Sequence, residues 1–80
     1  MTTPDDIKGW LVAALPCDSV QIDGDGQHFQ AVIVSPAFQG LSRVARHQRV
    51  YQALGEHMVS DIHALSMQTL TPEEWASHHG

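Results

Sequence analysis

The 80-residue chain has little cysteine, little positive charge and no long apolar run. Its single cysteine, Cys17, excludes an intrachain disulfide and a zinc site built from cysteine pairs. Four lysines and arginines against nine acidic residues give a formal charge of −5, which argues against non-specific nucleic-acid binding over the whole surface. Apolar runs such as residues 31–34 are far shorter than the ~20 residues of a membrane span. The sequence therefore predicts a cytoplasmic protein without a membrane segment.

The length predicts one domain, residues 1–80. Domains of this size bury only about 60% of the surface that the unfolded chain exposes, so the core is thin and a large enclosed active site is excluded. About half of the residues are apolar or glycine, which is the composition of a globular protein rather than of a disordered chain. The chain is therefore expected to fold.

The residue types that commonly carry catalysis have structural roles in this sequence. Cys17 precedes Asp18, whose negative charge raises the pKa of a neighbouring thiol and lowers its reactivity. The paired carboxylates lie at helix starts or in a turn, where acidic residues are favoured; they are Asp5/Asp6, Asp23/Asp25 and Glu73/Glu74. No glycine-rich phosphate loop follows a strand. We therefore expect a protein that is not an enzyme.

The first half of the chain predicts a helix followed by a β-hairpin. Thr3 and Pro4 are typical of a helix start, an apolar face recurs at helical spacing from Ile7, and Pro16 ends the helix. From Ser19 the apolar period changes to two, and residues 23–26 (DGDG) form a tight turn. A second strand follows over about residues 28–35. Its alternation predicts that one set of side chains faces the core and the other faces outward; the inward set is Phe29, Ala31 and Ile33, and the outward set is His28, Gln30, Val32 and Val34.

The second half predicts helix, strand and helix. Ser42 is an N-cap for a helix through about His57. Apolar residues at roughly helical spacing are expected to form its buried face; they are Leu41, Val44, Val50, Tyr51, Ala53 and Leu54. Residues 62–69 alternate as a third strand, with the core side left open, and residues 71–74 (TPEE) form a capping box for a terminal helix. The order αββαβα predicts an α+β fold, a three-stranded sheet with helices packed on one face.

Three of the four cations lie on the predicted central helix at i, i+3 and i+6: Arg43, Arg46 and Arg49. This spacing spreads them over about a third of the helix circumference. Two interpretations remain open, a patch that contacts phosphates and a solvated helix face.

Six histidines make metal binding the remaining chemistry to consider, because imidazole is a common ligand of zinc, copper and iron. No pair with helical HxxxH spacing stands on one element, so a zinc site complete within this chain is not expected. His28 and His63 differ from the others because both lie at strand starts, where a side chain can stand rigidly at a sheet edge. The residues alone leave open whether they are ligands or half-buried strand histidines.

Four separated blocks together resemble the signature of the BolA family. They are residues 38–40 (FQG), 46–54 (RHQRVYQAL), 62–65 (IHAL) and 71–75 (TPEEW). The segment 24–30 (GDGQHFQ) and the acidic balance are similar to the IbaG (YrbA) branch. The resemblance covers nearly the whole chain and implies a class II KH-like fold, αββαβα.

The resemblance also implies a partner and a cofactor. BolA-like proteins associate with monothiol glutaredoxins as heterodimers and share a bridging 2Fe–2S cluster, in iron–sulfur trafficking or in iron and stress signalling. The glutaredoxin and glutathione supply thiolates, and the BolA-like protein supplies a histidine at the position of His63. A second ligand comes from the hairpin region, where His28 is the nearest imidazole and Asp25 is an alternative oxygen ligand.

A second implied function is DNA binding in transcriptional regulation, with Arg43, Arg46 and Arg49 as the contacts. This chain departs from the KH pattern because it lacks a GxxG loop and carries a negative net charge. Only the arginine helix favours that function.

Overall fold

The computed structural model describes the backbone of residues 1–79 and the side chains of residues 1–77. Its elements are, in order, α1 (Pro4–Ala14), β1 (Ser19–Gly24), β2 (His28–Val34), the 3-10 helix η1 (Pro36–Phe38), α2 (Arg43–Leu54), α3 (His57–Ser60), β3 (Ala64–Leu70) and α4 (Pro72–His79). The expected αββαβα order is confirmed, with η1 and α3 added to it. None of the helices among residues 1–79 is long and apolar enough to cross a membrane.

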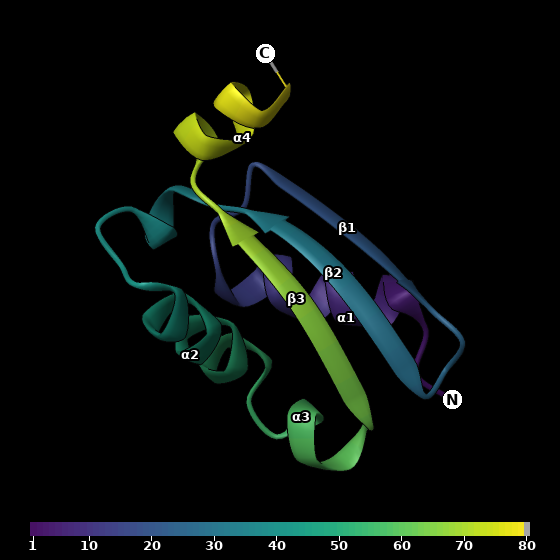
Figure 1. Ribbon diagram of the computed structural model, residues 1–80. Coiled ribbons are helices and arrows are strands. Elements are labelled where there is room, and N and C mark those ends of the chain that lie inside the picture. Colours follow the sequence, from purple (N-terminus) through teal and green to yellow (C-terminus); the bar gives the residue numbers. More distant parts are fainter. Residues whose placement is uncertain (80) are drawn as a thin grey trace.

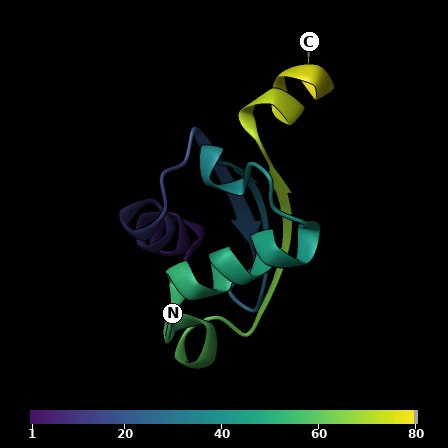
Figure 2. The ribbon, with the colours of Figure 1, turned by 90° about the vertical axis from the view of Figure 1, so that its left-hand side faces the viewer.

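The sheet has the order β1-β2-β3, so β2 is the central strand. β1 and β2 pair antiparallel as the predicted hairpin, with Val20 opposite Ile33. β2 and β3 pair parallel, with His28 opposite Ala64. A parallel pair needs a long crossover connection, which α2 and α3 supply here. Figures 1 and 2 show α1 and α2 together on one face of the sheet, as expected, whereas α4 lies beyond its end.

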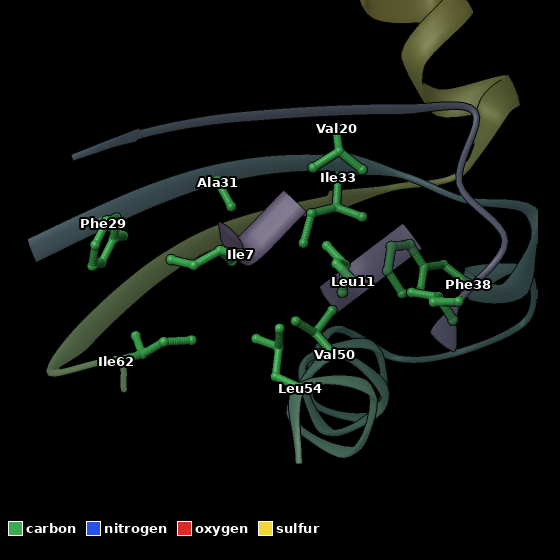
Figure 3. Packing of buried hydrophobic residues seen from close by; sticks show 11 residues of the cluster. Ile7, Leu11, Val20, Phe29, Ala31, Ile33, Phe38, Val50, Leu54 and Ile62 are labelled. Atoms are coloured by element: carbon green, nitrogen blue, oxygen red, sulfur yellow. The ribbon is translucent and has the colours of Figure 1, made fainter. Parts of the chain in front are cut away.

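The core lies between that face of the sheet and the two long helices (Figure 3). It consists of buried apolar side chains from both layers: Ile7, Leu11, Leu15, Val20, Phe29, Ala31, Ile33, Phe38, Val50, Leu54 and Ile62. The inward set predicted for β2 is confirmed. β3 turns the side chains of Leu65, Met67 and Thr69 to the same face, which settles the side that the sequence left open. Val34, expected to face outward, is buried, because it lies at the end of the central strand between Ser19 and Leu70.

The predicted buried face of the central helix is partly wrong. Val50 and Leu54 are buried, but Val44 is 68% exposed and Tyr51 is 43% exposed. The helix turns Arg46 toward the protein instead, and its guanidinium makes hydrogen bonds there. The predicted end at about His57 is also wrong. Gly55 has a positive φ of 56° and ends α2 after Leu54, so His57 begins the separate helix α3.

Arg46 and Glu74 join α4 to α2. The Arg46 Nη1 donates to Glu74 Oε1 at 2.6 Å, Nη2 donates to Oε2 at 3.2 Å, and the same guanidinium donates to the carbonyls of Leu41 and Thr69. Glu74 also accepts from the backbone N–H of Thr71, which completes the predicted capping box. The bonds from Arg46 and then Thr71 lower the pKa of Glu74 to about 2. The hydrogen bonds of Arg46 therefore help to hold the terminal helix α4 against α2 and β3.

Two glycine substitutions test how tightly the hairpin is packed. A Cβ at Gly24 would meet the Phe29 ring and stand 2.7 Å from the His28 carbonyl oxygen, whereas a Cβ at Gly9, inside α1, would meet nothing within 4 Å. We expect Gly24→Ala to lower the free energy of unfolding by about 1–3 kcal/mol. The matched control Gly9→Ala should raise it by about 0.5–1 kcal/mol. Urea unfolding of both variants measures this, and equal effects would contradict the packing at Gly24.

The depressed pKa of Glu74 predicts a pH dependence of stability. Its contribution is fully present above the unfolded-state value of 4.5 and is lost as the pH falls through about 2. Glu74→Gln should therefore be less stable than the parent at neutral pH, and the difference should shrink as the pH falls below 4.5. Urea midpoints measured from pH 6 downward test this. Glu73→Gln is the matched control, because it removes a carboxylate of the same helical turn that lies outside the ion pair. Parallel curves for Glu74→Gln and Glu73→Gln would contradict the role of the ion pair.

Candidate metal-binding site

The hairpin turn holds His28 at the start of β2. The Asp25 carboxylate accepts hydrogen bonds from the backbone N–H groups of His28 and Gln27, both at 2.9 Å, and Gly26 adopts the positive φ of 98° that the turn requires. These bonds, that from His28 first, lower the pKa of Asp25. The carboxylate of Asp25 is therefore already engaged in stabilising the turn, and the imidazole of His28 is the more available metal ligand.

His63 is held between two anchored neighbours. Ile62 before it is buried, and its N–H donates to the His57 carbonyl at 2.9 Å. The next residue, Ala64, begins β3 opposite His28, and its backbone N–H donates to the Gln27 carbonyl at 3.1 Å. The parallel pairing of β2 and β3 thus brings together two histidines that are 35 positions apart in the sequence.

The two imidazoles lie side by side at this corner of the sheet. Their ring centroids are 6.0 Å apart with an interplanar angle of 83°. Both residues are exposed, and neither ring makes a hydrogen bond within the described chain. Two imidazoles on one metal stand roughly 5–6 Å apart, because each M–N bond is ~2 Å long. Two rings at this centroid distance, with no hydrogen bond of their own, are candidates for nitrogen ligands of one metal.

His28 and His63 alone would not complete a coordination sphere. No group of three or more His, Cys, Asp or Glu side chains that could hold a metal occurs among the described residues. Cys17 is half-buried, its Sγ donates to the Leu15 carbonyl at 3.3 Å, and burial and then Asp18 raise the pKa of its thiol. The direction expected from Asp18 is confirmed, although burial is the larger cause. A metal or cluster at His28 and His63 would need further ligands from another molecule.

Two other histidines, His57 and His47, lie in surroundings that the sequence indicated only in part. The His57 ring stacks on Trp10 with centroids 3.6 Å apart, and its Nδ1 lies 2.6 Å from Asp61 Oδ2. The i, i+4 spacing of His57 and Asp61 was the available signal for the second contact, whereas nothing in the pattern pointed to Trp10. His47 has its Nε2 buried without a hydrogen-bond partner.

The three arginines on α2 do not form a uniform solvated face. Arg43 and Arg49 are exposed, but the Arg46 side chain is only 14% exposed and is engaged by Glu74, Leu41 and Thr69. Arg43 and Arg46 line an open groove of about 1120 Å³ between α2, β3 and α4. This groove lies at the opposite end of β3 from His63. Two free cations, rather than three, are therefore available to a phosphate.

The comparisons with known proteins agree in one family. Residues 14–74 match the family model described as BolA-like protein. The acid stress protein IbaG of Escherichia coli strain K12 is 43% identical over 72 residues, which are 89% of this chain and 86% of that protein. The DNA-binding transcriptional regulator BolA of Haemophilus influenzae is 46% identical over 56 residues, and this match spans 70% of this chain and 54% of that protein.

The solved structures support the same assignment. A BolA protein homologue from Coxiella burnetii is 49% identical, with a TM-score of 0.88 over 95% of this chain and 99% of that one. A BolA-like protein from Babesia bovis is 28% identical, with a TM-score of 0.87 over 100% of this chain and 96% of that one. The names of the sequence relatives are those of a stress protein and a regulator, not of enzymes. The chain belongs to the BolA family, in its IbaG branch.

Proposed function

We propose that this chain is a non-enzymatic partner of a monothiol glutaredoxin and that the two proteins share a bridging 2Fe–2S cluster. The heterodimer would serve iron–sulfur trafficking or iron and stress signalling. The observation that carries the proposal is the His28–His63 pair, two exposed imidazoles 6.0 Å apart with no third ligand beside them among the described residues. The class of partner is the one that the resemblance to the BolA family implies.

The donor set fits a shared cluster. Imidazole nitrogen is a known ligand of 2Fe–2S clusters, and histidine in place of cysteine raises the reduction potential. The remaining ligands would be thiolates, because iron–sulfur clusters are usually held by sulfur. This chain does not offer one at the site, since the pKa of its single thiol is raised and its Sγ donates to a backbone carbonyl. The thiolates would come from the glutaredoxin and from glutathione.

The chain itself would orient the two nitrogens. The Asp25 turn holds His28, and the bond from Ala64 to the Gln27 carbonyl holds the segment that carries His63. These backbone hydrogen bonds hold the two segments that carry the histidines next to each other when no partner is bound. This pre-organisation lowers the entropy cost of completing the site.

Spectroscopy of the mixed proteins tests the ligand assignment. Adding the parent chain to a cluster-loaded monothiol glutaredoxin should change the visible absorption and circular dichroism. We expect His63→Ala to abolish the change and His28→Ala to weaken it strongly, because each removes one nitrogen ligand. Asp25→Asn should retain it.

His47→Gln is the matched control, since it also removes one histidine but acts at the other end of β3. Its spectrum should equal that of the parent. A spectral change that survives His63→Ala would show that the ligand assignment is wrong. A heterodimer that forms without cluster and is unaffected by both substitutions would show an interaction module that works without metal.

A second function, DNA binding by the α2 helix, is favoured by the exposure of Arg43 and Arg49 and by the name of the H. influenzae relative, a DNA-binding transcriptional regulator. The logarithm of the affinity for duplex DNA should fall linearly as the logarithm of the salt concentration rises. Arg43→Ala and Arg49→Ala should each reduce the slope by ~1. Arg46→Ala should instead loosen α4, because its guanidinium holds Glu74. Absence of duplex retardation at low salt would contradict this function.

A further inference from the structure

A cluster of three side chains, from Trp10, His57 and Asp61, involves the segment that precedes His63 in the chain but neither of the two candidate ligands. The His57 imidazole stacks face to face on the Trp10 indole, with an interplanar angle of 4° and centroids 3.6 Å apart. Its Nδ1 contacts the Asp61 carboxylate at 2.6 Å. We call these three residues the Trp10–His57–Asp61 clamp. The clamp joins α1 to α3, two elements whose sequences are more than 40 positions apart.

The backbone connects the clamp directly to His63. The His57 carbonyl accepts from the N–H groups of both Asp61 and Ile62, each at 2.9 Å, and the Asp61 carbonyl accepts from the Thr2 hydroxyl at 2.7 Å. Ile62 is then buried in the core. No unanchored residue therefore separates the clamp from His63.

α3 needs such an anchor because it is only four residues long. A single helical turn is not stable by its own hydrogen bonds, and its N-cap, Glu56, makes no side-chain capping bond. Its apolar residues contribute little, since Val59 is 88% exposed and only Met58 packs on the core. The stack on Trp10 and the contact with Asp61 therefore add side-chain anchors at the start of the turn to the backbone bonds and the buried Ile62 that hold its end.

We infer that Trp10, His57 and Asp61 are positioning residues for the His28–His63 pair: the clamp sets the α3 turn, and the turn sets the direction from which the His63 imidazole meets that of His28. Its consequence for a cluster rests on the proposed function. The opposite side of His63 is held independently, by the bond from Ala64 to Gln27. Loss of the clamp would therefore displace the His63 ring while leaving the parallel strand pair intact.

The experiment separates positioning from general stability. In the isolated chain, the nuclear Overhauser effect between the His28 and His63 rings reports their relation without any cluster. His57→Ala should remove this effect and lower the affinity for a cluster-loaded monothiol glutaredoxin about 10-fold or more, the usual cost of losing a group that orients a metal ligand. His57→Phe, which keeps the stack on Trp10 but not the contact with Asp61, should restore part of both signals.

Val59→Ala is the matched control, because it truncates an exposed side chain on the same short helix. It should change neither signal. Asp61→Asn, which keeps a hydrogen-bond acceptor, gives a second test if His57→Ala does not fold, and it should weaken both signals less than His57→Ala would. Ring contacts and affinity that stay at the parent level in Asp61→Asn and His57→Phe alike would overturn the inference.

The two proposals fail in different ways. If the parent chain gives no cluster signal with the glutaredoxin, the proposed function fails, while the ring contact still tests the clamp. If the parent gives the signal and His57→Ala keeps both the signal and the ring contact, the positioning role is wrong and the proposed function stands.

Discussion

The parallel pairing of β2 with β3 is the constraint on which the rest of this structure depends. It places Ala64 opposite His28, and so brings the segment that carries His63 to the hairpin turn. It also requires a crossover, which α2 and α3 form, and the buried residues of α2 close the core over one face of the sheet. The same strand pair ends at Leu70, and α4 follows it at Pro72, where its Glu74 pairs with Arg46 of α2. The proximity of the candidate ligands and the closure of the hydrophobic core therefore both follow from this strand pairing.

Local signals predicted the elements well, and long-range contacts account for what they missed. Thr3 and Thr71 each begin a helix through a capping box, which spans only four consecutive residues and so depends on local sequence. The orientation of α2 could not be predicted in this way, because it depends on hydrogen bonds from Arg46 to Glu74 and to the Thr69 carbonyl, 28 and 23 positions away. Val44 and Tyr51 are apolar and were expected to be buried, yet that contact leaves them in solvent.

The candidate site shows the same division. His28 begins β2, as the alternation indicates, whereas His63 directly precedes β3, which starts at Ala64 and not at the predicted residue 62. Their proximity follows from the strand order, which the alternation does not indicate. The choice of His28 over Asp25 became clear only from the turn, where the carboxylate accepts two backbone N–H groups. The stack of His57 on Trp10 had no signal in the sequence, because it joins two helices whose packing only the folded chain determines.

The scarcity of cysteine and the two exposed imidazoles lead to one central claim, that this chain contributes two nitrogens to a cluster whose other ligands come from a partner. Pulsed electron paramagnetic resonance of the reduced heterodimer tests this most directly, with only this chain labelled with ¹⁵N in its histidines. We expect hyperfine couplings from two ¹⁵N imidazoles in the parent, from one in His28→Ala and from none in His63→Ala. A cluster that shows no ¹⁵N coupling from this chain would contradict it.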